Sequence, residues 1–189
     1  MGVCIQAYVN IKKKDAVEGE YDDSMNHIKA YVNPDFTGRA DDIKNGACYE
    51  FDDVEDGLSL SYGGYNLWRN ELAKLAGWPI YPELSDNPKQ SYAASAWRAS
   101  GGPFWELINF ADNEGVIGGA VSAKLAKDFS DYQVKADEHH DEFFRTIYSQ
   151  MRKCFEAAAN SGLVNFSSLL DALVNKYISQ STKQPKGVQ

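Results

Sequence analysis

The chain has 189 residues, 43% of them hydrophobic, which is enough for one domain with a substantial core. Its net charge of −8 argues against a broad surface for nucleic-acid phosphates, because such surfaces depend on Lys and Arg side chains. The same acidity suits a basic partner, or simply keeps the protein soluble. No apolar run approaches the roughly 20 residues that a membrane-spanning helix needs.

The three cysteines, Cys4, Cys48 and Cys154, are widely spaced and odd in number. This spacing argues against a disulfide framework or a zinc knuckle and predicts reduced thiols. The first residues lack the basic and apolar regions of a signal peptide. We therefore expect a cytoplasmic protein that contacts neither membranes nor nucleic acid directly, and no sequence motif requires a cofactor.

The first 62 residues predict short strands. Apolar and polar side chains alternate along 3–11, and a period of two is typical of a half-buried strand. The acidic segment 52–57 ends in Asp-Gly and predicts a tight turn. The segments 15–26 and 35–46 are predicted loops. Further strands are predicted at 27–32, 47–51 and 58–62.

From Tyr65 onward the apolar side chains recur with helical spacing. The first helix is predicted to end before Gly77 and Pro79. A long, partly ordered loop over 79–102 follows, anchored by Tyr92 and Trp97. Further helices are predicted from Pro103 to the glycines at 115–119, over 120–136, from the N-cap Asp141 to Ala158, and from Ser168 to Tyr177.

Strands therefore come first and helices follow, an order that predicts an α+β fold. We expect a small antiparallel sheet from the N-terminal third, packed against a C-terminal helical bundle. A mostly helical domain with a β-hairpin subdomain is the alternative. Residues 1–178 are predicted to form a single domain, and 179–189 a polar, flexible tail.

The segment 101–128 contains the first candidate site. Glu106 and Asn109 share one face of the predicted helix, and Asp112 and Glu114 follow at its C-terminal end, where the helix dipole opposes negative charge. The carboxylates of Glu106, Asp112 and Glu114 are candidates for acid/base hydrolysis or for binding a divalent cation. The alternative is a helical corner with solvated carboxylates.

The glycines of the same segment are candidates for holding an anion. Gly118 and Gly119 open the next predicted helix, whose first free N–H groups could hold a phosphate-bearing ligand, and Lys124 lies one turn further on. A glycine-rich turn without a Walker or Rossmann context is a weak signal. The alternative is a corner whose glycines only supply positive φ.

The segment 61–69 is the second candidate site. Two adjacent glycines flanked by tyrosines allow a backbone to approach a ligand on which aromatic rings stack. The alternative is a strand-to-helix turn with core aromatics. A cleft follows if this segment faces 106–119. Its ligand-binding candidates are Tyr62, Gly63, Gly64, Tyr65, Asn66 and Arg69.

No metal site is predicted. His139 and His140 are adjacent and lack the spacing of a metal-binding motif, so we interpret them as solvated residues near the start of a helix. No nucleophile motif such as GxSxG is present either.

Two segments, SYGGYNLWR (61–69) and PFWELINFADNEGVIGG (103–119), resemble an uncharacterised family of bacterial and phage-borne proteins. The later FEAAANSGLVNF (155–166) is similar to the same family, so the resemblance extends over about residues 58–166. It implies an intracellular bacterial or viral setting. No known activity comes with it, and it assigns no catalytic residue.

These observations favour an intracellular binding protein, phage-borne in one reading, for a protein partner or a small polar or phosphate-bearing ligand. Two alternatives stay open. One is a metal-assisted or acid/base hydrolase that uses Glu106, Asp112 and Glu114. The other is an acidic decoy that covers a basic surface on a host nucleic-acid-binding protein.

Overall fold

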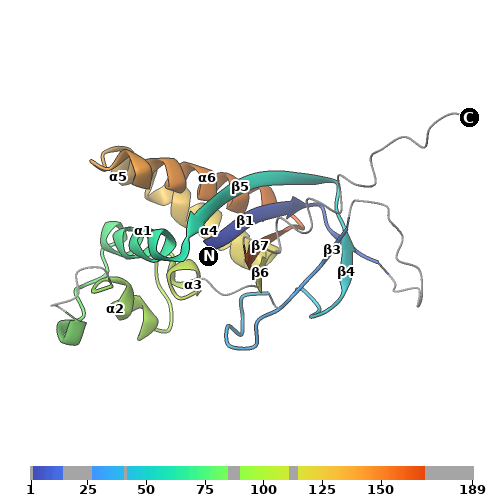
Figure 1. The fold of residues 1–189 in the computed structure, drawn as a ribbon, viewed down its shortest axis with the longest axis horizontal. Helices are drawn as coiled ribbons and strands as arrows, with labels where there is room; N and C mark the ends of the chain where they lie inside the picture. Colours follow the sequence, from blue (N-terminus) through green and yellow to red (C-terminus); the bar gives the residue numbers. More distant parts are fainter. Residues whose placement is uncertain (1, 15–26, 41, 85–89, 111–114, 169–189) are drawn as a thin grey trace, which may run out of the picture.

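The computed structural model of the protein describes residues 2–14, 27–40, 42–84, 90–110 and 115–168. It confirms the predicted α+β fold, with an antiparallel sheet packed against helices (Figure 1). The predicted loop at 15–26, nearly all of the last predicted helix, the domain boundary at 178 and the tail lie outside the described residues.

The main sheet has four antiparallel strands in the order β5-β1-β7-β6. Its central strands are β1 (Gly2–Val9) and β7 (Leu163–Ser168), and its edges are β5 (Asp53–Ser61) and β6 (Gly115–Gly118). Alternate residues of β1 are buried against the helices, which confirms the period of two read from the sequence. These buried residues are Val3, Ile5 and Ala7.

Two of these strands come from the C-terminal half, where the sequence predicts only helices and turns. The turn predicted at 115–119 is wrong for its first four residues, because they form the buried strand β6. β7 follows the longest helix directly and has no predicted counterpart. Both strands are short, and periodicity alone does not distinguish a short buried apolar run from a helix segment.

The tight turn predicted at 52–57 is also wrong, because Asp53 begins the nine-residue strand β5. The register between β1 and β5 slips beside Gly57, which is the extra residue of a β-bulge. A Cβ atom on Gly57 would lie 2.2 Å from the carbonyl oxygen of Ile5 and 2.8 Å from Sγ of Cys154. The glycine therefore permits close backbone approach within a strand.

A second, smaller sheet covers one end of the main sheet on the face away from the helices. Its strands run in the order β2-β4-β3, namely β2 (Lys12–Lys13), β4 (Cys48–Glu50) and β3 (His27–Lys29). β3 and β4 are shorter forms of the strands predicted at 27–32 and 47–51. Apolar side chains of this layer pack on the main sheet in one cluster, formed by Ala30, Ala40, Ile43, Tyr49, Val116 and Leu163.

The other face of the main sheet is covered by α4 (Gly119–Asp131) and α6 (Glu142–Ala158), with α5 (Gln133–Asp137) between them in the chain (Figure 1). The Asp141 carboxylate accepts a hydrogen bond from the Phe143 backbone N–H at 2.9 Å, so the predicted N-cap is confirmed. Within the described part of the chain, no helix is long and apolar enough to cross a membrane.

The remaining helices lie near the start of β1. They are α1 (Tyr62–Leu75), the 3-10 helix η1 (Pro82–Leu84), α2 (Ala93–Trp97) and α3 (Trp105–Ile108). α1 ends as predicted before Gly77, whose φ is +87°. α3 begins only at Trp105, because Phe104 adopts a left-handed conformation instead of extending the helix toward Pro103. Trp97 anchors its segment as expected, donating from Nε1 to the Ile108 carbonyl at 3.2 Å.

The bulge yields a stability prediction. Gly57→Ala forces a methyl group into the Ile5 carbonyl, so we expect the free energy of unfolding to fall by about 2 kcal/mol. The control is Gly63→Ala, in the first turn of α1, where a Cβ meets no atom within 4 Å. There we expect a gain of about 0.5 kcal/mol. Urea denaturation measures both, and equal stabilities of the two variants would contradict the assignment of Gly57.

Candidate functional site

The two segments that the sequence singles out pack directly against each other, and Arg69 joins them. The Arg69 Nη1 donates to the carbonyl oxygens of Ile108, at 3.2 Å, and Phe110, and its Nη2 donates to Asn66 Oδ1. The guanidinium lies 4.7 Å from the ring centroid of Tyr65 and is buried. Arg69 thus satisfies carbonyl groups at the C-terminal end of α3, where helices leave such groups without intrahelical partners.

The other residues of 61–69 form the first turns of α1. Ser61 accepts a hydrogen bond from the Gly64 backbone N–H at 3.0 Å and caps the helix. Tyr65 is fully buried, Tyr62 is half-buried against the core, and Gly63 is exposed. The segment has the geometry of a strand-to-helix junction with core aromatics.

Glu106, the first candidate carboxylate, lies in an ion-pair network. The Lys124 Nζ lies 2.5 Å from Glu106 Oε2 and 2.8 Å from Asp128 Oδ2. It also donates to the Gly102 carbonyl at 2.8 Å. Asp128 Oδ2 in turn accepts a hydrogen bond from the Phe104 backbone N–H at 2.7 Å. The Lys124 ammonium group therefore occupies the position beside Glu106 that a bound metal ion would need.

The other candidates of this corner divide into described and undescribed residues. Asn109 is half-buried and ends α3, with its backbone N–H donating to the Trp105 carbonyl at 2.9 Å. Asp112 and Glu114 lie outside the described residues. Within the described ranges, no group of three or more His, Cys, Asp or Glu side chains is placed to hold a metal ion.

Arg39 belongs to this corner but gives no signal in the sequence, because it lies in a predicted loop. It is 3% exposed, its Nε donates to the Glu106 carbonyl at 3.1 Å, and its guanidinium lies 4.1 Å from the ring centroid of Trp105. Burial lowers the pKa of Arg39, and the Glu106 carboxylate opposes that shift.

The N-terminal end of α4 is capped by a carboxylate of the same chain, that of Asp42. The Gly119 backbone N–H donates to Asp42 Oδ2 at 2.9 Å. A Cβ atom on Gly118 would lie 1.8 Å from Asp42 Oδ1, so only glycine leaves room for the carboxylate. The carboxylate caps the helix as a side-chain N-cap does. An external phosphate at this position would have to displace Asp42.

The two edges of the main sheet differ in how they are covered. At β6, the backbone N–H groups of Val116 and Gly118 donate outward to the carbonyls of Tyr31, at 3.0 Å, and Arg39, at 2.8 Å. At β5, no backbone hydrogen bond joins the outer side to another described segment. β5 is the outermost strand of the sheet in Figure 1. The main sheet therefore has one covered edge and one open edge, as far as the described residues show.

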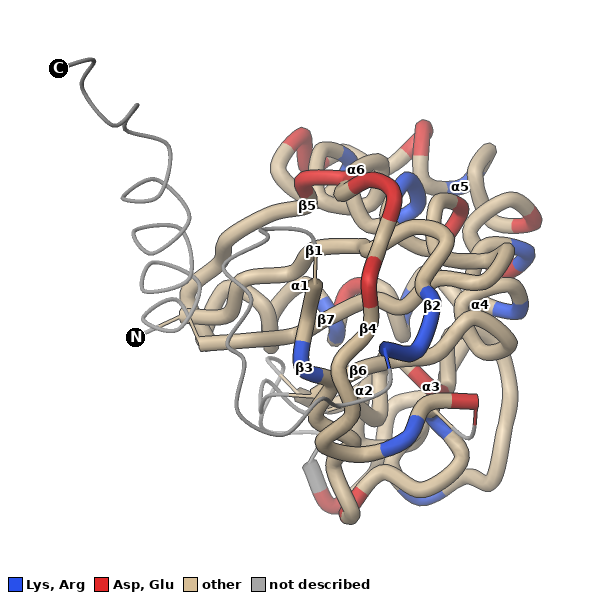
Figure 2. Tube along the Cα trace, turned by 90° about the vertical axis from the view of Figure 1, so that its right-hand side faces the viewer, with Lys and Arg blue, Asp and Glu red and all other residues tan. Residues whose placement is uncertain are grey.

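The open edge is acidic along its first half. Asp53 and Asp56 are exposed and Glu55 is half-buried. Figure 2 shows the acidic positions following one another from β4 into β5. None of these three carboxylates forms an ion pair within the described part of the chain, although Gln6 Nε2 donates to Asp56 Oδ1 at 3.2 Å.

The negative potential of this edge extends into the core behind it. Burial, with a smaller contribution from the carboxylates of Glu55 and Asp56, raises the pKa of the Cys154 thiol to about 12. The thiol is therefore protonated and unreactive at neutral pH.

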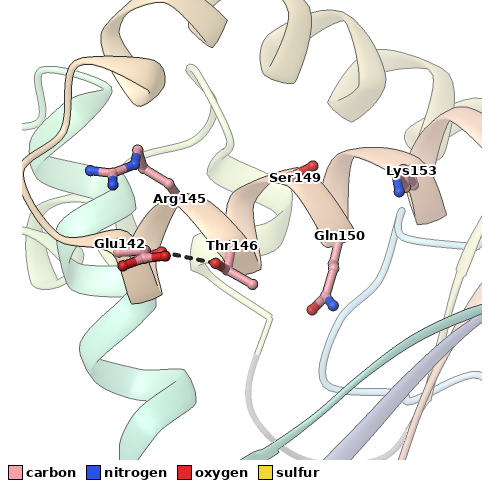
Figure 3. Close-up of a pocket in the computed structure, with 6 residues that line it drawn as sticks. All are labelled: Glu142, Arg145, Thr146, Ser149, Gln150 and Lys153. Carbon is pink, nitrogen blue, oxygen red and sulfur yellow. Dashed lines mark hydrogen bonds between the residues drawn. The ribbon is translucent and has the colours of Figure 1, made fainter.

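A hollow of about 460 Å³ lies on α6 (Figure 3). All of its lining residues come from this one helix, and Figure 3 shows them spread along its outward side. It is an open, polar helix face, and no convergent set of groups fixes a ligand there. The lining residues are Glu142, Arg145, Thr146, Ser149, Gln150 and Lys153.

Comparison of the chain with protein-family models, curated proteins and solved structures finds no match. The resemblance of 61–69 and 103–119 to bacterial and phage-borne proteins therefore stays a prediction. Function has to be inferred from the contacts, burial and charge of the described residues.

The internal anion at α4 yields a second stability prediction. Asp42→Ala removes the cap of α4, so we expect the free energy of unfolding to fall by about 1 kcal/mol. Asp35→Ala is the control, an exposed carboxylate nearby in the chain whose side chain has no partner among the described residues. It should change stability by less than about 0.5 kcal/mol. Equal melting curves for the two variants would contradict a capping role for Asp42.

Proposed function

We propose that this protein is a binding protein that holds a partner protein along the open edge of its main sheet. The supporting observation is that β5 has no backbone partner on its outer side within the described residues, whereas the loop that contains Tyr31 and Arg39 covers β6. Unpaired N–H and C=O groups along a strand are a template for pairing with another chain. The cytoplasmic setting belongs to the same proposal and agrees with three free cysteines.

A protein partner has more support than a small ligand at the Arg69 corner. Apart from the buried Arg69 Nε, the charged groups there have partners within the chain: the Arg69 Nη1 holds carbonyl groups, Lys124 holds two carboxylates, and Asp42 caps the end of α4. A small polar ligand would have to break these contacts. A partner at β5 breaks none of them and pairs with backbone groups that have no backbone partner on the outer side of the strand among the described residues.

The acidic decoy is a special case of this proposal, since it too requires a basic protein partner. The net charge of −8 and the unpaired carboxylates of β5 support it. The hydrolase gains no such support, because Glu106 is ion-paired with Lys124 and its two companions lie outside the described residues.

Site-resolved photo-crosslinking tests the proposed function. A photo-reactive amino acid replaces either Ser59, which is exposed on β5, or Ser149, which is exposed on α6. Illumination of cells that naturally produce the protein should give a discrete covalent adduct from position 59 and none from position 149. Excess unmodified protein should suppress this adduct by competition. Absence of an adduct at position 59, or the same adducts from both positions, would overturn the proposal.

A further inference from the structure

We infer that the partner segment at β5 is a basic extended peptide, which adds to the main sheet as a fifth strand and places its Lys or Arg side chains beside Asp53 and Asp56. This inference rests on the proposed function and specifies the chemistry of the partner. Two features of the described residues carry it: an unpaired sheet edge, and uncompensated negative charge on that same edge.

The edge offers enough backbone for one added strand. β5 has nine residues, which is longer than a typical strand of about five or six. The bulge at Gly57 divides it into an acidic half, Asp53–Asp56, and an uncharged half that runs from Leu58 to Ser61. Bulges interrupt a ladder locally, so an added strand would pair with either half, and charge favours the acidic half for a basic segment.

The charges on β5 select the sign of the partner. Charged side chains on an edge strand normally protect the sheet from pairing with copies of itself. In a symmetric pairing centred on Asp53–Asp56, carboxylates of one copy would face carboxylates of the other, and like charges opposite each other are destabilising. A segment with Lys or Arg experiences attraction at the same positions. The acidic half therefore disfavours a second copy and favours a basic strand.

The side chains beside the edge indicate a pattern within the basic segment. Leu58 and Leu60 are half-buried and pair with the buried β1 residues Ile5 and Val3, so they lie on the face that the helices cover. Asp56 and Ser59 lie on the opposite face and are exposed. In the acidic half, Asp53 and Glu55 pair with Val9 and Ala7 and lie on the helix-covered face, whereas Asp56 lies on the opposite face. A basic side chain on either face of an added strand therefore meets a carboxylate, and a strand that alternates basic and apolar residues places all its basic side chains on one of these faces.

Peptide binding read by amide hydrogen exchange tests the inference on the full chain. The probe is a peptide of about ten residues that alternates Lys with Val and Thr, and two controls have the same length. One control replaces Lys by Glu. The other alternates Lys with Pro, which keeps the charge but removes strand donors. Only the Lys–Val/Thr probe should bind and slow the exchange of alternate amides in β5 by tenfold or more.

Charge reversal provides the matched variant. Asp53→Lys combined with Asp56→Lys should weaken probe binding at least tenfold, because attraction becomes repulsion. Both side chains are exposed and outside any ion pair among the described residues, and the variant loses only two exposed hydrogen bonds, from Gln6 and from the Val54 backbone N–H, so it should stay folded with a melting temperature close to that of the unmodified protein. The corresponding reversal on α6, Glu142→Lys, should leave probe binding unchanged.

Each other outcome overturns a separate part of the inference. Equal binding of the Lys–Pro control, or binding without new protection in β5, means that only surface charge attracts the peptide and that no strand is added. Equal binding of the Glu control rejects a basic partner. If sedimentation analysis shows a dimer and the amides of β5 are protected from exchange in it, the edge pairs with a second copy of the chain. In these cases a photo-crosslinked partner at position 59 would still uphold the proposed function, whereas failure of the crosslink alone would reject that function.

Discussion

The antiparallel pairing of β1 with β7 is the constraint on which the rest of the structure depends. Six residue pairs, from Val3 with Ser168 to Tyr8 with Leu163, join the two ends of the described chain. The pairing fixes β1 in the middle of the sheet and leaves β5 and β6 as its edges. The pairing also brings the connection between α6 and β7 close to β1. A Cβ on Gly162, in this connection, would lie 2.5 Å from the Tyr8 carbonyl oxygen, so only glycine permits the approach.

Charged side chains in this protein are used mainly to hold elements together. Arg69 joins α1 to α3, Lys124 joins α3 to α4, and Asp42 caps α4 from a distant loop. This use follows from the cost of leaving polar groups buried without partners. Surface backbone groups that still lack a protein partner are therefore candidates for binding another molecule. On the described surface, the backbone groups along the outer edge of β5 are of this kind.

Local periodicity predicts the elements whose signal is local. The alternation in β1, the stop of α1 at Gly77 and the cap of α6 at Asp141 are all visible in a few consecutive residues. β6 and β7 are not, because short buried runs lack a distinguishing period. Long-range contacts such as Asp42 with Gly119 leave no local trace either. The role of β5 as an open edge depends on which strands pair, so the strand predicted at 58–62 could not reveal it.

Residue-resolved amide hydrogen exchange of the free protein tests the central claim, an asymmetry between the two sheet edges. The outward amides of β6, at Val116 and Gly118, donate to loop carbonyls and should exchange slowly. Alternate amides of β5, which face away from β1, should exchange nearly as fast as in an unfolded chain. Slow exchange at every amide of β5 would mean that its edge is already covered, and would contradict the account.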